Sequence, residues 1–459
     1  MMDTATASEA VHGMQRGENA WFDGVAIDSR VVRAGELFVA LRGERFDGHD
    51  YVGQAFERGA AAAMVALDRA ASQSGNLVTV SDPVRALGAL AAFWRERFTL
   101  PVAGVVGSNG KTTVKEMIAA ILRTQFAHEE VHATAGNLNN AIGLPLTVLG
   151  LRAKHRAAVF EIGMNHAGET AELAAIAQPT VAVINNAQRE HQEFMKSVAD
   201  VAAEHAALLS ALPVGGVAVI NADDDYAPYW TEIVTRRNAE GAMLTVRDFG
   251  LRAPAAVTGR FRIESWGTVI DVSAPEGRVS FELRAPGRHN VSNALGALAA
   301  ATAAGADLAS AAAGLAAFRP LAGRLQASDL PDGGAVIDDT YNANPDSVRA
   351  AIAVLARASA PRWLVFGDMG EVGDEGVAFH REVGAYARAA GIDRLLGVGE
   401  LAQHAVNAFG TNGEHFADVA TLSAALQPIP GLTVLVKGSR FMRMERVVAA
   451  LTGATAEAH

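Results

Sequence analysis

The chain is organised by one repeated pattern, in which a short apolar segment is followed by a loop and then by a segment of helical length. In the middle of the chain the pattern begins with residues 102–106 and 111–124, and it continues to residue 221. It returns after residue 335. Apolar segments that alternate with helices of this length are typical of a mostly parallel sheet with helices on both faces. The sequence therefore predicts an α/β fold.

A chain of 459 residues is long enough for three or four domains, and the pattern changes at two places. Residues 1–98 form the expected N-terminal α/β domain. Residues 99–319 carry the longest run of the pattern and then, at 255–283, alternating residues with turn glycines, which indicate added antiparallel strands. Residues 320–459 predict a second doubly wound, Rossmann-like domain. In the first domain we expect strands at 24–27, 36–41 and 76–80 and helices at 52–58 and 83–97.

The composition excludes several classes of protein. Lys and Arg number 39 and Asp and Glu number 50, so the net charge is −11 and an extended nucleic-acid-binding face is not expected. The absence of cysteine excludes disulfide scaffolds, thiolate metal sites and cysteine nucleophiles. The first residues lack the features of a signal peptide, and the alanine-rich segment 294–306 is too short to span a bilayer. We therefore expect a cytoplasmic protein with no membrane insertion and no nucleic-acid partner.

The strongest chemical signal is the segment GVVGSNGKTT at residues 104–113, which lies between an apolar strand and a helix. This is the context of a phosphate-binding loop, in which backbone N–H groups and the helix N-terminus hold the phosphates. Lys111 would reach the outer phosphates, and the hydroxyl of Thr112 would coordinate Mg²⁺. The common pattern has a glycine where this chain has Val105, and the alternative is a glycine-rich turn without a ligand. The loop residues expected to bind nucleotide are Gly107, Ser108, Asn109, Gly110, Lys111, Thr112 and Thr113.

Two further candidates follow neighbouring strands of the expected central sheet. Glu161 lies at the end of an apolar strand, where a buried carboxylate needs a partner, and His191 follows the next strand. Metal-dependent phosphoryl transfer needs such ligands near the ends of adjacent strands, so we predict a metal site formed by Thr112, Glu161 and His191. The alternative for His191 is a solvated loop residue. A GTPase is not expected, because the chain contains no Asn-Lys pair and so lacks the guanine-recognition motif.

Separate motifs along the whole chain resemble those of the Mur ligase family, which acts in cell-wall synthesis. Besides the glycine-rich loop, they are TAGNLNNAIGLPLTVL (134–149), FEIGMNHAGE (160–169), INNAQREH (184–191), GRHNVSNALGALAA (287–300), LAGRLQ (321–326), DDTYNANPDSV (338–348), GDMGEVG (367–373) and KGSRFMRME (437–445). The N-terminal stretch IDSRVVRAGELFVALRGERFDGHDY (27–51) is also similar to the family. Because the motifs occur in order across all three expected domains, the resemblance covers the whole chain.

The resemblance implies an ATP-dependent amide ligase of peptidoglycan precursor synthesis, with ATP and Mg²⁺ as cofactors. In this family ATP phosphorylates a carboxylate to an acyl phosphate, which an amine then attacks. The motifs at 367–373 and 437–445 resemble most the member that joins D-alanyl-D-alanine to UDP-N-acetylmuramoyl-tripeptide, so these molecules are the expected partners. One alternative is a sibling that adds diaminopimelate or lysine, although the Asp-Asn-Pro-Arg motif of the diaminopimelate-binding form is absent. The other is a nucleotide-binding protein without catalysis. We expect a monomer.

By resemblance, residues outside the loop complete the nucleotide site. Two asparagines would contact adenine, because amides match both donors and acceptors on that base; helix capping by Asn290 is the alternative. The planar guanidinium of Arg324 would reach the γ-phosphate, unless it is a surface arginine. Asp339 would bind ribose, and the alternative for its loop is a simple turn. The residues in this set are Asn290, Asn293, Arg324, Asp339, Tyr341 and Asn342.

The resemblance also implies contacts with the substrates. Lys437, which follows an apolar strand, would contact a substrate carboxylate or a phosphate. The uridine-diphosphate pocket would be formed by Ser29, Arg30, Arg42 and Asp47. Peptide or sugar contacts would come from Asn137, Asn139 and Asn140, for which structural turns are the alternative. The predicted catalytic residues are Lys111, Glu161, His191, Arg324 and Lys437.

One family feature is missing from this chain. The family usually carries a lysine, carbamylated into a carboxylate-like group, on the helix after the magnesium-binding histidine. Here the segment 201–213 has no lysine, and none occurs between residues 197 and 436. The resemblance implies a second magnesium ion, which Glu204 or His205 is expected to support instead; the alternatives are that this ion is held more loosely or that both residues cover a solvated helix face. The sequence therefore predicts activity that does not depend on bicarbonate.

Overall fold

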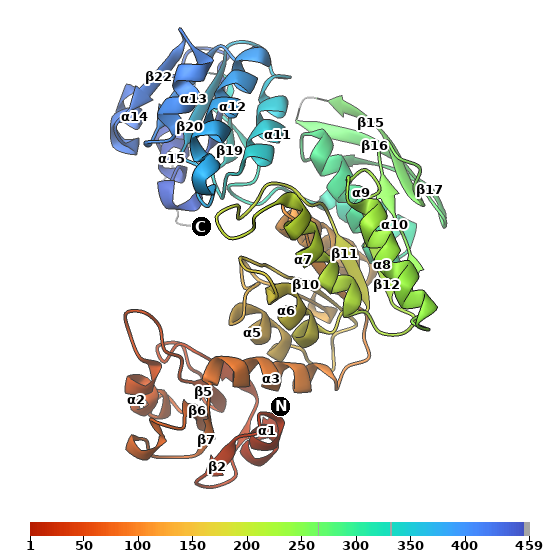
Figure 1. Ribbon diagram of the computed structural model, residues 1–459, viewed down its shortest axis with the longest axis vertical. Helices are drawn as coiled ribbons and strands as arrows, with labels where there is room; N and C mark the ends of the chain where they lie inside the picture. Colours follow the sequence, from red (N-terminus) through yellow and green to blue (C-terminus); the bar gives the residue numbers. More distant parts are fainter. Residues whose placement is uncertain (265, 331–332, 454–459) are drawn as a thin grey trace.

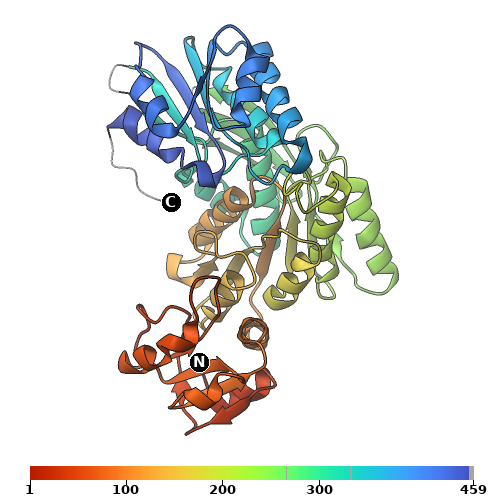
Figure 2. The ribbon, with the colours of Figure 1, turned by 60° about the vertical axis from the view of Figure 1, so that its left-hand side comes forward.

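The computed structural model describes residues 1–264, 266–330 and 333–453. Three α/β units follow one another along the long axis of the molecule, from the N-terminal unit at one end to the C-terminal unit at the other (Figures 1 and 2). The predicted α/β class is confirmed, since parallel strands form most of each main sheet. No helix in the described part of the chain has the length and apolar composition needed to cross a membrane.

The N-terminal unit is built on a five-stranded sheet in the order β2-β7-β6-β5-β4, in which β2 is the antiparallel edge strand. A two-stranded ribbon of β1 and β3 lies beside it. Its elements are β1 (Met2–Asp3), α1 (Thr4–Ala10), β2 (Met14–Arg16), β3 (Trp21–Phe22), β4 (Gly24–Ala26), β5 (Glu36–Val39), η1 (Gly48–Tyr51), α2 (Val52–Glu57), β6 (Ala62–Ala66), η2 (Ala70–Ser72), β7 (Leu77–Val80) and α3 (Pro83–Arg95).

Helix α3 connects the first unit to the second. It begins with Pro83 after the cap Asp82, whose side chain accepts hydrogen bonds from two backbone N–H groups of the first turn. At its other end the buried guanidinium of Arg95 donates to the carbonyls of Ala177 and Gln178 in the central unit. The apolar core runs without a break from one unit into the next.

The central unit contains a six-stranded, fully parallel sheet in the order β13-β12-β11-β8-β10-β9. Its strands are completely apolar over most of their length, as expected when helices cover both faces. Its elements are β8 (Val102–Val106), α4 (Lys111–Gln125), η3 (His128–Glu130), β9 (Val131–Ala133), α5 (Gly143–Leu149), β10 (Ala157–Glu161), α6 (Glu169–Ala177), β11 (Val181–Ile184), α7 (Val198–Ser210), β12 (Val217–Ile220), α8 (Ala227–Ala239) and β13 (Thr245–Val246).

A smaller sheet and two helices complete this unit. The sheet has the order β14-β15-β16-β17, and the last three strands are antiparallel, which confirms the expected change of pattern. Helices α9 and α10 pack against α4 and bury its apolar face. The elements are β14 (Phe249–Gly250), β15 (Val257–Glu264), β16 (Gly267–Ala274), β17 (Gly277–Leu283), α9 (Arg288–Ala303) and α10 (Leu308–Ala317).

The C-terminal unit has a six-stranded sheet in the order β18-β19-β23-β20-β21-β22, with β18 as its antiparallel edge. Its elements are β18 (Gln326–Asp329), β19 (Ala335–Asp339), α11 (Pro345–Leu355), β20 (Arg362–Gly367), η4 (Gly373–Glu375), α12 (Gly376–Ala389), β21 (Arg394–Val398), α13 (Ala402–Phe409), β22 (Gly413–Phe416), α14 (Val419–Ala425), β23 (Thr433–Lys437), η5 (Arg440–Met442) and α15 (Glu445–Thr452).

The predicted elements are present, with ends that differ by up to two residues, but several short strands were not predicted. The clearest case is β6, a fully buried strand at the centre of its sheet whose sequence AAMVA carries no alternation and is rich in alanine. Burial on both faces removes the alternating signal, so such a strand cannot be told from a helical segment by its pattern. The domain boundaries at 98/99 and 319/320 stay predictions.

The close packing of α10 on α4 predicts an effect of one glycine. A Cβ at Gly314 would lie 2.6 Å from the Cα of Ile121, so Gly314→Ala must separate the two helices and should destabilise the protein by roughly 1–3 kcal/mol. Gly53→Ala in α2 is the matched control, because a Cβ there meets no atom within 4 Å. Differential scanning calorimetry should show a lower unfolding temperature for Gly314→Ala and no loss for Gly53→Ala. An unchanged temperature for Gly314→Ala would contradict this packing.

Candidate functional site

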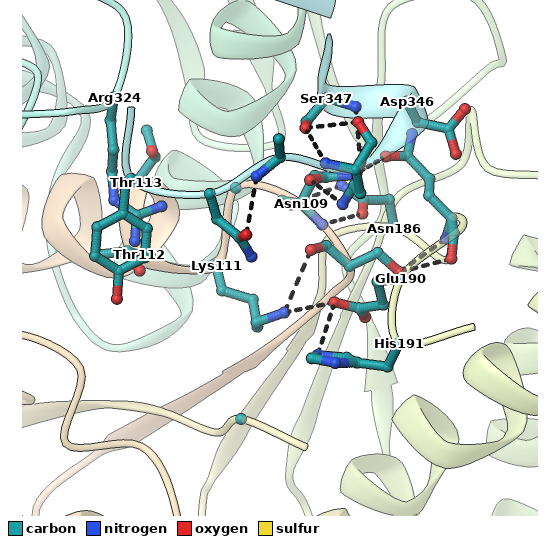
Figure 3. A pocket seen from close by; sticks show the side chains of 18 of the residues that line it. Asn109, Lys111, Thr112, Thr113, Asn186, Glu190, His191, Arg324, Asp346 and Ser347 are labelled. Carbon is teal, nitrogen blue, oxygen red and sulfur yellow. Dashed lines mark hydrogen bonds and ion pairs between the residues drawn. The ribbon is translucent and has the colours of Figure 1, made fainter. Parts of the chain in front are cut away.

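The carboxyl ends of three adjacent parallel strands define the site. Strand β8 lies between β10 and β11, so the loops that follow these strands meet at one edge of the sheet. In doubly wound sheets ligands bind outside this edge. A cavity of about 410 Å³ lies here, lined by residues of the central and C-terminal units (Figure 3).

The glycine-rich loop connects β8 to the start of α4, as its sequence predicts. Gly110 caps α4 with a φ of 81°, and a Cβ there would lie 2.7 Å from the side-chain oxygen of Asn293. Only glycine fits such a position. Val105, where the common motif has glycine, lies inside β8 with its side chain in the core and takes no part in the loop. The departure from the common pattern therefore does not affect the loop.

Lys111 begins α4, and its ammonium group is directed back over the loop. It donates to the carbonyl of Gly107, and its Nζ lies 3.1 Å from Oε2 of Glu190. Thr112, the next residue, is buried at the wall of the cavity. Together these contacts place a cation and a hydroxyl at the N-terminus of a helix, the arrangement that binds phosphate groups.

Glu161 is the last residue of β10 and is only 3% exposed. Its Oε1 accepts a hydrogen bond of 2.8 Å from the side-chain amide of Asn139. Its Oε2 has no hydrogen-bond partner among the described residues, although it is buried. A buried carboxylate oxygen without a partner is costly, and a cation would satisfy it. The residues present therefore fit a divalent cation beside Thr112.

His191 is not the solvated loop residue considered as an alternative. Its side chain is largely buried, and its Nδ1 lies 2.6 Å from Oε2 of Glu371 in the C-terminal unit. This contact lowers the pKa of Glu371. Both residues have a positive φ, 49° for His191 and 57° for Glu371, a conformation that is uncommon for side chains other than glycine. The contact joins two units across the cavity.

Glu190 is a site residue that the sequence reasoning missed. It lines the cavity next to His191, is 6% exposed, and lies between Lys111 and His191 (Figure 3). Burial alone would raise the pKa of Glu190, but the charge of Lys111 and the contacts with His205 and His191 hold the pKa at about 2. Nε2 of His205 lies 3.3 Å from Oε1 of Glu190. The available signal was its position in the loop after β11, next to the predicted metal ligand His191.

The prediction that Glu204 could support a magnesium ion is wrong. Its carboxylate accepts hydrogen bonds from the backbone N–H groups of Gly168 and Thr170 at the start of α6, at 2.8 and 2.6 Å. Carboxylates are stabilising at helix N-termini because free N–H groups point there. His205, the neighbouring residue, points instead toward Glu190. Both residues are buried, so the alternative of a solvated helix face is also wrong.

Asp339 and Lys437 form an ion pair at the C-terminal side of the cavity. They are opposite each other in the parallel pair β19–β23, and Nζ of Lys437 lies 2.5 Å from the Asp339 carboxylate. The same ammonium donates to the backbone carbonyl of Asn342. The guanidinium of Arg324 stacks over the ring of Tyr341 at 4.0 Å from its centroid. All five side chains line the cavity.

The amides of α9 form a chain with those of the central sheet. Asn290 donates to the carbonyl of Pro286, Asn293 donates to Asn290, and Asn185 donates to Asn293. Helix capping by Asn290 is wrong, because the capping residue is Gly287 and no side chain caps this end. Burial lowers the pKa of the neighbouring His289 to about 4, which keeps this imidazole neutral at pH 7.

The other predicted contacts divide into two groups. The first lines the cavity and consists of Asn137, Asn139 and Asn140. The second lies in the N-terminal unit outside the cavity lining and consists of Ser29, Arg30, Arg42 and Asp47. In that unit the Ser29 hydroxyl donates to Gln54, and Asp47 is paired with Arg42, Arg69 and His49. Asn140 has the structural turn role named as its alternative, since its side chain accepts hydrogen bonds from two backbone N–H groups at the start of α5.

An arginine that the sequence did not single out connects the two units that line the cavity. Arg189, in the loop after β11, pairs with Asp346 at 2.6 Å and with Glu382 at 2.7 Å. Both carboxylates belong to the C-terminal unit, and together they raise the pKa of the guanidinium. Nearby, Asn109 of the glycine-rich loop exchanges hydrogen bonds with the side chain of Asn344.

Within the described residues no group of three or more His, Asp or Glu side chains is already arranged to hold a metal ion. This agrees with the chemistry of Mg²⁺, which usually keeps several waters and takes one or two protein carboxylates together with phosphate oxygens.

Family comparisons agree with this geometry. Residues 22–138 match the Mur ligase family catalytic domain, residues 105–301 the Mur ligase middle domain, and residues 323–440 the Mur ligase glutamate ligase domain. The chain belongs to the Mur ligase family. It is 40% identical over 450 residues, 97% of each chain, to the UDP-N-acetylmuramoyl-tripeptide–D-alanyl-D-alanine ligase of Escherichia coli.

Solved structures show the same arrangement of units. MurF from Acinetobacter baumannii superposes with a TM-score of 0.89 at 31% identity, covering 98% of this chain and 99% of that chain. MurF from Thermotoga maritima, solved in complex with ADP, superposes with a TM-score of 0.81 at 26% identity and covers 94% of this chain and 97% of that chain.

The Arg189 contacts predict a role in holding the cavity closed. Arg189→Met keeps the apolar stem, but Asp346 loses its ion-pair partner and Glu382 keeps only Arg349, so we expect weaker contact between the units and a Kd for ATP raised about fivefold, equivalent to about 1 kcal/mol. Isothermal titration calorimetry would measure the affinity, and small-angle scattering would show a larger radius of gyration. Arg349→Met is the control, because Arg349 forms an ion pair with Glu382 only and its side chain is 45% exposed. Equal effects of both variants would contradict this role.

Proposed function

We propose that this protein is an ATP-dependent amide ligase that joins D-alanyl-D-alanine to UDP-N-acetylmuramoyl-tripeptide through an acyl phosphate. The observation that carries the proposal is the presence, in one cavity, of the loop lysine Lys111 and of Lys437 from the C-terminal unit. The ammonium of Lys111 suits the phosphates of ATP, and the ammonium of Lys437 suits a substrate carboxylate or a phosphate. The near full-length relative of that name supports the choice of substrates.

In this proposal the nucleotide lies between the central and C-terminal units. The backbone of residues 107–110 and the ammonium of Lys111 hold its phosphates, and Arg324 approaches the γ-phosphate. The side chains of α9 contact adenine, and Asp339 accepts from ribose hydroxyls. The ADP bound by the Thermotoga maritima relative supports a nucleotide at this family's site.

Mg²⁺, when bound, would neutralise phosphate charge and polarise the transferred phosphoryl group. Thr112, Glu161 and His191 are the side chains that would hold it, and the unpartnered Oε2 of Glu161 supports this assignment. The remaining task of the protein is to place the carboxylate, the γ-phosphate and the amine in line and to exclude water, because little covalent chemistry falls to its own side chains.

The acceptor would reach the cavity from the N-terminal unit. Ser29, Arg30, Arg42 and Asp47 would hold its uridine diphosphate, and the asparagines of residues 137–140 would contact its peptide or sugar. A monomer in the cytoplasm is the expected state of the enzyme.

The function is tested by phosphate release with ATP, Mg²⁺, UDP-N-acetylmuramoyl-tripeptide and D-alanyl-D-alanine, leaving out one component at a time. We expect release only with all four. Release triggered by diaminopimelate or lysine in place of the dipeptide would identify a sibling ligase. No release with any amine would indicate a nucleotide-binding protein without catalysis.

Lys111→Ala should remove activity without unfolding the protein. The ammonium lies in a polar cavity rather than in the apolar core, so its loss removes charge stabilisation of the transition state, roughly 3–4 kcal/mol or about a hundredfold to a thousandfold in kcat. It also leaves Glu190 without its ammonium partner, so we expect a folded protein with a lower unfolding temperature. Lys154→Ala, at an exposed position, is the matched control. Circular dichroism would verify folding. More than half of the wild-type turnover in Lys111→Ala would exclude the assignment.

Asp339→Asn should weaken binding of ATP more than binding of the UDP-linked peptide. Charge-assisted hydrogen bonds to ribose hydroxyls are worth roughly 1.5–3 kcal/mol, and the uridine pocket is expected in another unit. Asparagine is preferred to alanine because Asp339 also accepts from the backbone N–H of Leu325 and pairs with Lys437. Separate calorimetric titrations of the two ligands would measure the difference. Equal weakening of both would indicate a general closure defect.

A further inference from the structure

Several buried polar atoms around the phosphate-binding loop lack hydrogen-bond partners. Among the described residues, Oε2 of Glu161 and Nδ1 of His205 have none, and Oε1 of Glu190 and Nε2 of His205 have only each other, at 3.3 Å. His205 is 1% exposed, so solvent does not satisfy its ring. Buried polar groups of this kind need a partner, which an ordered water, an ion or a ligand can supply. The mechanism described above uses Glu161 but leaves Glu190 and His205 without a role.

The charge on Glu190 is balanced by Lys111 alone among the lysines and arginines of the described chain. The ion pair joins Nζ of Lys111 to Oε2 of Glu190, and the other oxygen faces His205. If the phosphates of a nucleotide take the ammonium of Lys111, the buried carboxylate loses this partner. Removing one partner of a buried ion pair is strongly unfavourable, so another cation must replace it.

We propose that Glu190 exchanges Lys111 for a divalent cation when nucleotide binds, and that His205 positions the Glu190 carboxylate for that cation. The inference rests on the proposed function, because it assigns a further ligand within the same nucleotide site. Glu190 supplies one carboxylate oxygen, and phosphate oxygens and waters supply the rest. This is the coordination that Mg²⁺ prefers, and it requires no group of three protein ligands in the free enzyme.

The same assignment explains how this chain acts without a lysine on α7. His205 occupies about the expected position of that lysine, and its ring contacts a carboxylate that comes from the loop after β11. The negative charge is therefore supplied by a side chain of the protein and does not need carbon dioxide.

Cation binding can be measured without the peptide or the dipeptide, by Mn²⁺ electron paramagnetic resonance on the whole enzyme with a non-hydrolysable ATP analogue. We expect the wild type to bind one Mn²⁺ with the nucleotide and a second at Glu190. Glu190→Gln should weaken the second ion at least tenfold and leave the first unchanged, because loss of a supporting side chain typically costs 10- to 100-fold in metal affinity. His205→Asn should weaken the second ion less, by about threefold to tenfold.

Glu193→Gln is the matched control, since Glu193 is an exposed glutamate of the same loop and lies outside the cavity lining. It should bind both ions like the wild type. Circular dichroism of each variant distinguishes loss of the ion from loss of the fold, and His205→Asn provides a second test if Glu190→Gln does not fold. If folded Glu190→Gln binds both Mn²⁺ ions with wild-type affinity, the inference is overturned. If Glu190→Gln does not fold, wild-type affinities in folded His205→Asn overturn it instead. This readout is separate from the ligase reaction, so failure of the proposed function would appear only in the phosphate-release assay.

Because α7 has no lysine that could be carbamylated, the inference can also be tested with bicarbonate. The wild type should lose no rate in carbon-dioxide-free buffer, and added bicarbonate should restore nothing. Activation by bicarbonate would overturn the inference, because it would show that a carbamate rather than Glu190 supplies the charge.

Discussion

Parallel pairing of β8 with β10 and β11 is the constraint on which the site depends. It brings the loops that follow three strands to one edge of the sheet, and these loops carry Lys111, Glu161 and Glu190. Charged groups collected at a buried edge must compensate one another. The Lys111–Glu190 ion pair does this, and it links the N-terminus of α4 to the loop after β11.

The cavity is divided between two units, so its geometry depends on how they meet. Arg189 and His191 come from the loop after β11, and both pair with carboxylates of the C-terminal unit. The loop after β11, which is hydrogen-bonded to the phosphate-binding loop, therefore also contacts the unit that holds ribose in the proposed function. Coupling of this kind is expected where a ligase must close around several substrates.

Local residue patterns were sufficient to predict much of the molecule. The alternation of apolar and helical segments predicted the α/β class and most strands, and the motif at 104–113 predicted a glycine-rich loop between a strand and a helix, which is observed. Glu161 was found because a carboxylate in an apolar strand requires a partner. The buried strand β6 was missed because burial on both faces leaves no alternation to detect.

The sequence by itself determined which side chains follow the strands, because strand, loop and helix are set by local composition and by the conformational needs of glycine. Tertiary structure alone decided the partners of those side chains. Glu204 and His205 are adjacent on α7, yet one accepts from the start of α6 and the other faces Glu190. Successive helical residues point about 100° apart, so the packing of α7 between two neighbours, not the spacing along the chain, assigns one to structure and the other to the site.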